Sequence, residues 1–259
     1  MLRYCSLYSG SSGNSFFVES NKTQILIDAG VSTKKILTAL DKLNVSINNI
    51  QGILVTHEHT DHTKSLANLS AKYNIPIYAN KKTWNAIPEI SDKISSDNKK
   101  IFNMLENFSI GDLKIFAFKI SHDAADPCGF NIYNSNKKIS IATDIGCVTE
   151  DLLENLKNSS SILLEANYDP NILKCSRYPY ILKERISGKK GHLSNSSAGK
   201  VLSNLCNFGL TQALLIHLSK ENNFPELAYQ TVVDELSQNK NISINIAPRN
   251  EPSDLFNVI

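Results

Sequence analysis

The stretch Thr56-His57-Glu58-His59-Thr60-Asp61-His62 constrains the fold of this chain more than any other part of its sequence. Three imidazoles and the Asp61 carboxylate follow directly after the apolar run 50–55. That run is typical of a buried strand in a layered α/β core, and the apolar spacing after it predicts a helix over 62–73. The cluster therefore lies where a strand ends and a helix begins, and open α/β sheets place their chemistry at the carboxyl ends of strands.

Composition places the chain among ordinary globular proteins. It has 259 residues, of which 41% are hydrophobic and 20% are charged, and its net charge is +2. Such a small charge gives no global attraction to nucleic acid, so a phosphate-binding surface would have to be local. The N-terminus lacks a signal-peptide pattern, no apolar run reaches the length of a membrane span, and the five scattered cysteines suggest free thiols. We therefore expect a cytoplasmic protein with no membrane segment.

The order of predicted elements indicates an α/β fold. Strands are expected at 2–8, 15–20, 23–28, 50–55, 75–79, 108–111, 113–120, 128–134, 138–143, 161–164, 213–216 and 242–246. Helices are expected at 32–43, 62–73, 81–87, 149–156, 191–207 and 225–236, with partly helical structure over 170–190. The polar, lysine-rich segment 88–100 reads as a surface loop. A βαβ-rich pattern with one antiparallel run predicts a single domain over 1–259 with two sheets.

All six histidines fall at a strand end or a helix start: His57, His59, His62, His122, His192 and His217. A lone histidine is usually structural, but six in equivalent positions, accompanied by Asp61 and Asp144, are better explained by a metal site. His57 and His59 are two residues apart, so in extended backbone they face the same way and can hold one ion. Asp61 and His62 lie at the following turn and point elsewhere.

One short segment can therefore supply ligands to two ions, with Asp144 as the natural bridging carboxylate. Asp28, at the end of strand 23–28, either terminates the strand, caps the next helix or orients a metal-bound histidine. Imidazole and carboxylate ligands suit zinc, manganese or iron. Paired ions about 3.5–4 Å apart lower the pKa of bound water and stabilise the oxygens of a displacement, which is a hydrolase design.

These residues carry a family resemblance. His57-x-His59-x-Asp61-His62, together with Asp28, His122, Asp144 and His217, resembles the pattern of the metallo-β-lactamase fold superfamily. The resemblance implies a four-layer αββα sandwich with a dinuclear site at one edge. It implies that His57, His59 and His122 bind the first ion and that Asp61, His62 and His217 bind the second, with Asp144 as the bridge.

Two further segments resemble the branch that contains tRNase Z and the phosphonate-pathway phosphodiesterases. Gly191-His192-Leu193-Ser194-Asn195 is similar to the His-Ser-Thr segment of that branch, and Glu165-Ala166-Asn167-Tyr168-Asp169 occupies the place of its His-Glu-Ala-Thr segment. The resemblance implies that His192 is a general acid, that Glu165 is its partner, and that both act with Asp61 in catalysis. The histidine of the second segment is missing here, so the proton relay departs from that pattern.

These segments, with the loop 9–15 and the stretch 217–223, also resemble the bacterial YycJ/WalJ group, whose members are regarded as cytoplasmic DNA exonucleases. That resemblance implies substrate contacts from loops around the site: Ser12, Asn14, Ser194, Asn195, Lys220, Asn222 and Asn223. Ser194-Asn195 at a helix N-terminus suits an anion. Asn195 can equally be an ordinary helix cap, and the loop 9–14 can equally be a simple hairpin connection.

The leading hypothesis is a phosphodiesterase with two divalent ions that acts on DNA, with a metal-bound hydroxide as nucleophile and His192 as the acid. The basic segment 174–190, with Tyr178 and Tyr180, would be either its nucleic-acid face or a solvated helical face. Alternatives are a phosphodiesterase for small cyclic or nucleotide phosphodiesters, a ribonuclease, and a non-catalytic binding protein on a hydrolase scaffold.

Overall fold

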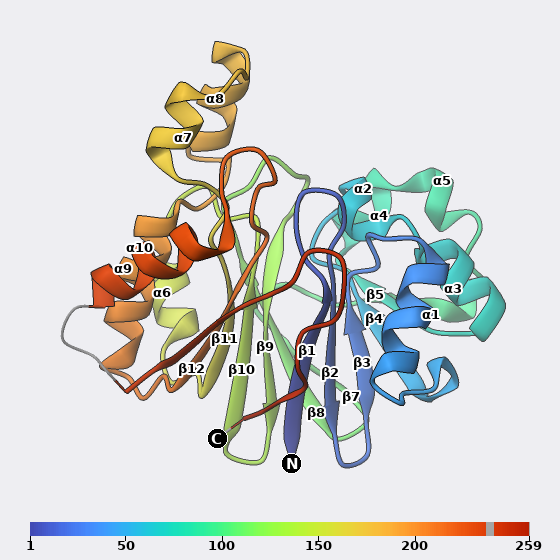
Figure 1. Ribbon diagram of the computed structural model, residues 1–259. Helices are drawn as coiled ribbons and strands as arrows, with labels where there is room; N and C mark the ends of the chain where they lie inside the picture. The colour runs from blue at the N-terminus through green and yellow to red at the C-terminus, as the bar shows by residue number, and fades with distance from the viewer. Residues whose placement is uncertain (237–240, 259) are drawn as a thin grey trace.

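Two seven-stranded sheets lie face to face in the computed structural model, which describes residues 1–236 and 241–258 (Figure 1). The first sheet has the order β14 (Phe256–Asn257), β1 (Leu2–Tyr8), β2 (Ser15–Ser20), β3 (Gln24–Ile27), β4 (Ile50–Leu54), β5 (Ile77–Ala79), β6 (Lys99–Ile101). The second has the order β13 (Ser243–Ile246), β12 (Gln212–Ile216), β11 (Ser161–Glu165), β10 (Lys137–Ala142), β9 (Cys128–Asn134), β8 (Leu113–Lys119), β7 (Asn107–Ile110).

Each sheet contains a run of four parallel strands. Strands β3 to β6 are parallel to one another, as are β10 to β13, whereas β7 to β10 form an antiparallel run. The carboxyl ends of β3, β4, β8, β10, β11 and β12 consequently meet at one edge of the molecule, which is where chemistry collects in open α/β sheets.

Helices cover the outer face of each sheet (Figure 1). On the first side lie α1 (Thr33–Lys42), α2 (Thr60–Thr63), α3 (Leu66–Tyr73), α4 (Lys81–Ala86) and α5 (Pro88–Ser91). On the second side lie α6 (Glu150–Leu156), α9 (Asn195–Cys206) and α10 (Pro225–Leu236), while α7 (Pro170–Cys175) and α8 (Tyr180–Ser187) project beyond the site edge. Two short 3-10 helices, η1 (Ile47–Asn49) and η2 (Ser96–Asn98), precede β4 and β6.

Three apolar clusters hold these layers together. One lies between the first sheet and its helices and includes Leu26, Ile36 and Leu69. A second joins the inner faces of the two sheets, and a third packs the second sheet against α6, α9 and α10. Three buried interfaces between four layers make the αββα sandwich that the resemblance implied.

The segment 88–100 was wrongly predicted as a loop, because it contains α5 and η2 and ends in the edge strand β6. A three-residue strand that contains Lys99 and Lys100 has too little apolar pattern to be recognised. The strand β14 was missed because its two residues are also too few to show a pattern. The expected helix over 62–73 is divided into α2 and α3, with Ser65 donating its hydroxyl to the Val31 carbonyl at the break.

The cysteines are all free thiols, as expected. Within the described ranges, no helix combines the length and apolar character that crossing a bilayer requires. The single-domain prediction for 1–259 stays a prediction.

Candidate metal centre

Three histidines bring ring nitrogens together at the end of β4 and β8. His59 Nδ1 lies 3.0 Å from His57 Nε2 and 3.3 Å from His122 Nε2. The spacing of two residues does place His57 and His59 on the same side, and His122 arrives from the opposite sheet. Three converging imidazole nitrogens form one group of possible metal ligands.

A second group forms beside the first. Asp61 Oδ2 lies 3.4 Å from His62 Nε2 and 3.8 Å from His217 Nε2. Asp144 lies between the two groups, with Oδ2 3.3 Å from His62 Nε2 and Oδ1 3.6 Å from His122 Nε2. The structure thus brings together all seven residues predicted as ligands, in the two sets that the resemblance implied.

Hydrogen bonds behind the cluster determine which nitrogen of His62 and of His122 faces inward. His62 Nδ1 lies 2.7 Å from Asp28 Oδ2, and Asp28 also accepts hydrogen bonds from the backbone and hydroxyl of Thr56 at 2.9 and 2.8 Å. His122 Nδ1 donates to the Gly191 carbonyl over 3.0 Å. A carboxylate or carbonyl behind a histidine leaves the other nitrogen free to bind a metal, so Asp28 has the orienting position considered above.

The backbone is strained where three of these residues leave their strands. Asp28, Asp144 and His217 have φ values of 60°, 59° and 58°, in the left-handed region that side chains other than glycine rarely adopt. Asp28 and Asp144 follow β3 and β10, and His217 follows β12. The strain turns each side chain into the shared edge, and such strain persists only where surrounding contacts hold it.

Buried charges in this cluster suit a cation. Burial lowers the pKa of His217, but Asp144 and Glu165 outweigh burial and raise that pKa to about 10. Burial and neighbouring imidazoles hold the pKa of His57 well below its usual range. Protons on some imidazoles therefore balance the buried carboxylates, and divalent ions would take the place of those protons. The donor set fits divalent metal binding.

Glu165 and His192 form a hydrogen-bonded pair at the same edge, and with Asp144 and His217 they make a further group of possible metal ligands. Glu165 is fully buried at the end of β11, and its Oε1 lies 2.7 Å from His192 Nδ1. Its other oxygen accepts the backbone N–H groups of Ile145 and Leu193 at 2.6 and 3.0 Å. Burial would lower the pKa of His192, but the Glu165 carboxylate outweighs this and raises it. His192 is thereby oriented with Nε2 free.

Glu165 also contacts one member of the metal group. Its Oε1 lies 3.1 Å from His217 Nδ1, so the same carboxylate faces both His192 and His217. The histidine of the His-Glu-Ala-Thr pattern precedes the glutamate, and this chain has the buried Leu164 of β11 in that place. Two residues after Glu165, Asn167 donates its side-chain amide to the His217 carbonyl over 2.8 Å.

The loop 9–15 reaches the cluster, as the resemblance implied. The Asn14 amide nitrogen lies 3.1 Å from His62 Nε2 and 3.4 Å from Asp61 Oδ2, while its oxygen accepts from the Gly10 N–H. Ser12 is exposed on the same loop. Its neighbour Ser11, which was not singled out from the sequence, lines the cavity beside the histidines.

Several predicted substrate contacts are used inside the protein instead. Asn195 and Asn223 are buried and bond each other through both amide groups, at 3.0 and 2.9 Å. Ser194, rather than Asn195, is the N-cap of α9, and its hydroxyl accepts from Ser197 N–H. Asn222 is also buried. These side chains brace the site from behind, and among the residues of 217–223 predicted to bind substrate only Lys220 is exposed.

A cavity of 190 Å³, here called the histidine cavity, opens over the cluster. The helix α8 and the segment after it form one wall of this cavity. From the sequence, this region was recognised only as basic and partly helical. Leu182, Arg185, Ile186 and Lys190 line this wall, opposite His59, Asp61 and His217. Contacts between elements so distant in sequence leave no local pattern that could have revealed them.

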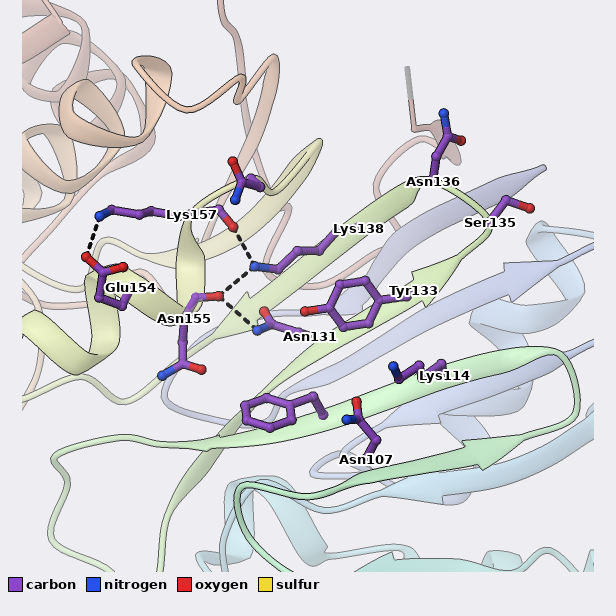
Figure 2. Close-up of a pocket in the computed structure, with 12 residues that line it drawn as sticks. Asn107, Lys114, Asn131, Tyr133, Ser135, Asn136, Lys138, Glu154, Asn155 and Lys157 are labelled. Carbon is purple, nitrogen blue, oxygen red and sulfur yellow. Dashed lines mark hydrogen bonds and ion pairs between the residues drawn. The ribbon is translucent and has the colours of Figure 1, made fainter.

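A larger cavity of 680 Å³ lies elsewhere, on the outer face of the second sheet (Figure 2). Two of the three lysines that line it are engaged: Lys138 Nζ donates to the Asn155 and Lys157 carbonyls at 2.6 and 2.7 Å, and Lys157 pairs with Glu154. None of its lining residues belongs to the histidine cluster, so this cavity is separate from the metal centre.

Comparison with known proteins agrees with this geometry. A family model described as a beta-lactamase superfamily domain matches residues 23–218. Exodeoxyribonuclease YycJ of Bacillus anthracis is 37% identical over 237 residues, which cover 92% of this chain and 90% of that protein. Exodeoxyribonuclease WalJ of Streptococcus pneumoniae is 39% identical over 238 residues, covering 91% and 88%.

A solved structure shows the same fold. The metallo-beta-lactamase fold protein YhfI of Bacillus subtilis superposes with a TM-score of 0.74, covering 98% of this chain and all of that one, at 14% sequence identity. The matched family model and the relatives aligned over nearly their whole length both show the family. This chain belongs to the beta-lactamase superfamily and, within it, to the family that includes YycJ and WalJ.

Proposed function

We propose that this protein is a metal-dependent phosphodiesterase that removes nucleotides from an end of DNA. The observation that carries the proposal is the Glu165–His192 pair beside the two groups of metal ligands. That pair provides a proton donor next to a site that can bind the anionic oxygens of a phosphodiester. The names of the two relatives, both exodeoxyribonucleases, support DNA as the substrate.

Two divalent ions fit the donor set, one held by His57, His59 and His122 and the other by Asp61, His62 and His217, with Asp144 shared. Imidazole and carboxylate donors suit zinc, manganese or iron. Such ions, when bound, lower the pKa of water and neutralise charge on phosphate oxygens. Asp28 and Gly191 keep His62 and His122 correctly oriented for this task.

His192 is suited to donate a proton to the leaving oxygen of the nucleotide. Glu165 holds its Nδ1 over 2.7 Å, and the same carboxylate raises the pKa of His192, which favours the protonated ring. A positioned acid of this kind contributes about 10²- to 10⁴-fold to rate. Lys190 lines the same cavity and supplies positive charge for phosphate groups, as does Arg185, which pairs with Asp123 over 3.0 Å. We further propose that the protein acts in the cytoplasm.

The test of function is hydrolysis of end-labelled DNA, RNA of the same sequence and a small cyclic phosphodiester, each with zinc, manganese and iron. We expect progressive shortening of DNA from one end. Preference for RNA or for the small phosphodiester would replace DNA with one of the two alternative substrates, and no hydrolysis of any phosphodiester would contradict the enzyme proposal.

The role of His192 is tested by His192→Ala in the same assay. We expect turnover to fall by about 10²- to 10⁴-fold, because the variant loses the proton donor. Metal content, measured by elemental analysis, should stay at the wild-type value because His192 lies outside the two ligand groups proposed above. Loss of metal would identify His192 as a ligand and refute its assignment as the acid.

A further inference from the structure

Helix α8 separates two cavities. Its residues Leu182, Arg185 and Ile186 face the histidine cavity. Its other face, with the neighbouring α7, borders a cavity of 470 Å³, here called the arm cavity, which is lined by Tyr168, Pro170, Leu173, Lys174, Tyr180, Lys183, Glu184 and Ser187. An α-helix with its side chains is about 10–12 Å across, so a bound chain that crosses α8 can reach both cavities.

The lining of the arm cavity combines apolar surface with positive charge. Leu173 and Tyr168 are buried at its base, whereas Tyr180 is 74% exposed on its rim. Lys174 and Lys183 also line it, with Lys183 Nζ donating to the Lys174 carbonyl over 2.7 Å, and among the described residues Glu184 is the only acidic one in the lining. An exposed aromatic ring beside lysines is the combination that binds single-stranded nucleic acid, by stacking on bases and attracting phosphates.

The segment 170–190, which contains α7 and α8 and is here called the arm, is hydrogen-bonded at both ends to segments near the metal centre. At its start, Asp169 caps α7 and donates its backbone N–H to the Asn222 carbonyl over 2.9 Å. At its end, the carbonyls of Lys189 and Lys190 accept hydrogen bonds from Ser121 and Asp123, next to His122. Both ends of the arm are therefore tied to segments that carry site residues.

We propose that the arm cavity binds an unpaired nucleobase of the same substrate strand whose scissile phosphate lies in the histidine cavity. The inference rests on the proposed function and adds a subsite to it. Tyr180 stacks on the base, Lys174 and Lys183 attract the adjoining phosphates, and the strand crosses α8 beside Arg185. The occupant is a nucleic acid rather than a protein segment because two lysines line the cavity together with the exposed ring.

Tyr180→Ala tests this subsite, with Tyr229→Ala as a matched control, since Tyr229 is an exposed tyrosine on α10. Stacking on one base contributes about 1–3 kcal/mol, so kcat/KM for a single-stranded oligodeoxynucleotide should fall about 5- to 150-fold in Tyr180→Ala. Hydrolysis of bis(4-nitrophenyl) phosphate should be unchanged, as should both activities of Tyr229→Ala. An equal loss on both substrates, or no loss, would overturn the subsite.

Oligonucleotides with one abasic position, moved stepwise from the cleaved end, identify the base. At the position that occupies the arm cavity, the difference between wild type and Tyr180→Ala should disappear; a difference that persists at every position overturns the assignment. Fluorescence anisotropy of the same oligonucleotides measures binding without hydrolysis. Binding that depends on Tyr180 in a protein that hydrolyses no nucleic acid would refute the proposed function alone, whereas hydrolysis indifferent to Tyr180 would refute the subsite alone.

Discussion

At the residue scale, the site depends on side chains whose backbone conformation is unfavourable. Asp28, Asp144 and His217 all adopt the left-handed region, which is uncommon for residues other than glycine although Asp and His enter it more often than most. Backbone hydrogen bonds hold two of them there: the Asp28 N–H donates to the Leu54 carbonyl over 2.8 Å, and the His217 N–H donates to the Ser9 hydroxyl over 2.7 Å. The strain is thus part of how the strands deliver ligands.

Replacing Asp28 should weaken metal binding although Asp28 is not itself in a ligand group. In Asp28→Ala, the His62 ring loses its acceptor at Nδ1 and Thr56 loses both of its bonds to the carboxylate. Removing such a partner typically lowers metal affinity 10- to 100-fold. Competition with a fluorescent chelator measures the change.

A control for this prediction is Asp112→Ala, which removes another hydrogen-bonded carboxylate. Asp112 accepts from Thr23 over 2.7 Å at a turn outside the metal site, so its loss should leave metal affinity unaltered. Asp28→Asn, which keeps the size of the side chain, guards against failure to fold. Wild-type affinity in both Asp28 variants would refute the orienting role.

Single residues also show how far sequence reasoning extends. Each predicted metal ligand lies at a strand end or in the histidine-rich segment, where type and position can be read directly. Asn195 and Asn223 were assigned to substrate because the sequence does not show that two residues 28 apart bond each other. Thr56 was not singled out, since its contact with Asp28 depends on the parallel pairing of β3 and β4.

At the element scale, a close approach of two loops positions the ligand segment. The loop after β3 packs against the segment 57–62, where a Cβ at Gly30 would lie 1.6 Å from the Asp61 carbonyl oxygen. The Ala29 N–H donates to the His62 carbonyl and so ties the loop to this segment, while the Gly30 N–H donates to the Asn14 carbonyl of the loop 9–15, each over 2.8 Å. Only glycine permits this contact, so residue 30 controls where Asp61 and His62 lie.

We expect Gly30→Ala to displace that segment and to destabilise the protein by about 3 kcal/mol, because inserting an atom into a packed contact forces the backbone to move. Gly209→Ala is the control: Gly209 has φ 84° but open space around its Cβ position, so only about 1 kcal/mol of conformational strain is expected. Urea denaturation and metal content measure both. Equal stability losses, with metal retained in each variant, would contradict the positional role.

Elements with a strong pattern were predicted well, and elements without one were not. The buried parallel strands β4, β11 and β12 are short apolar runs, and their ends were placed to within one residue. The strand β6 contains two lysines and gains its place by pairing with β5, whose register the sequence does not display. Helix α8 was recognised as partly helical and basic, but its position beside the histidines follows from tertiary contacts.

At the scale of the whole molecule, charge is arranged locally rather than globally. A net charge of +2 gives no overall attraction to a polyanion, so binding must rely on a concentrated group of cations. The arm from Pro170 to Lys190 carries such a group: Lys174, Arg177, Lys183, Arg185, Lys189 and Lys190. This arm, with α7 and α8, projects from the edge of the sandwich where the metal centre lies (Figure 1).

The double variant Lys189→Glu with Lys190→Glu tests whether this local charge binds the substrate. Both side chains are exposed, and only their backbone carbonyls brace the site, so the fold should be retained. We expect weaker binding to single-stranded DNA and a plot of log affinity against log salt that is shallower by about 1.4, since each lost phosphate contact on a single strand removes about 0.7.

Lys99→Glu with Lys100→Glu is the matched control, because these adjacent lysines lie on β6 at the far edge of the first sheet. It makes the same change in net charge, so a general loss of attraction would appear equally in both double variants. Fluorescence anisotropy across a salt series distinguishes the two cases. If the affinity and the salt slope change only in the 189–190 variant, the nucleic acid binds beside α8. If both double variants change alike, the arm is a solvated helical face that does not bind the substrate.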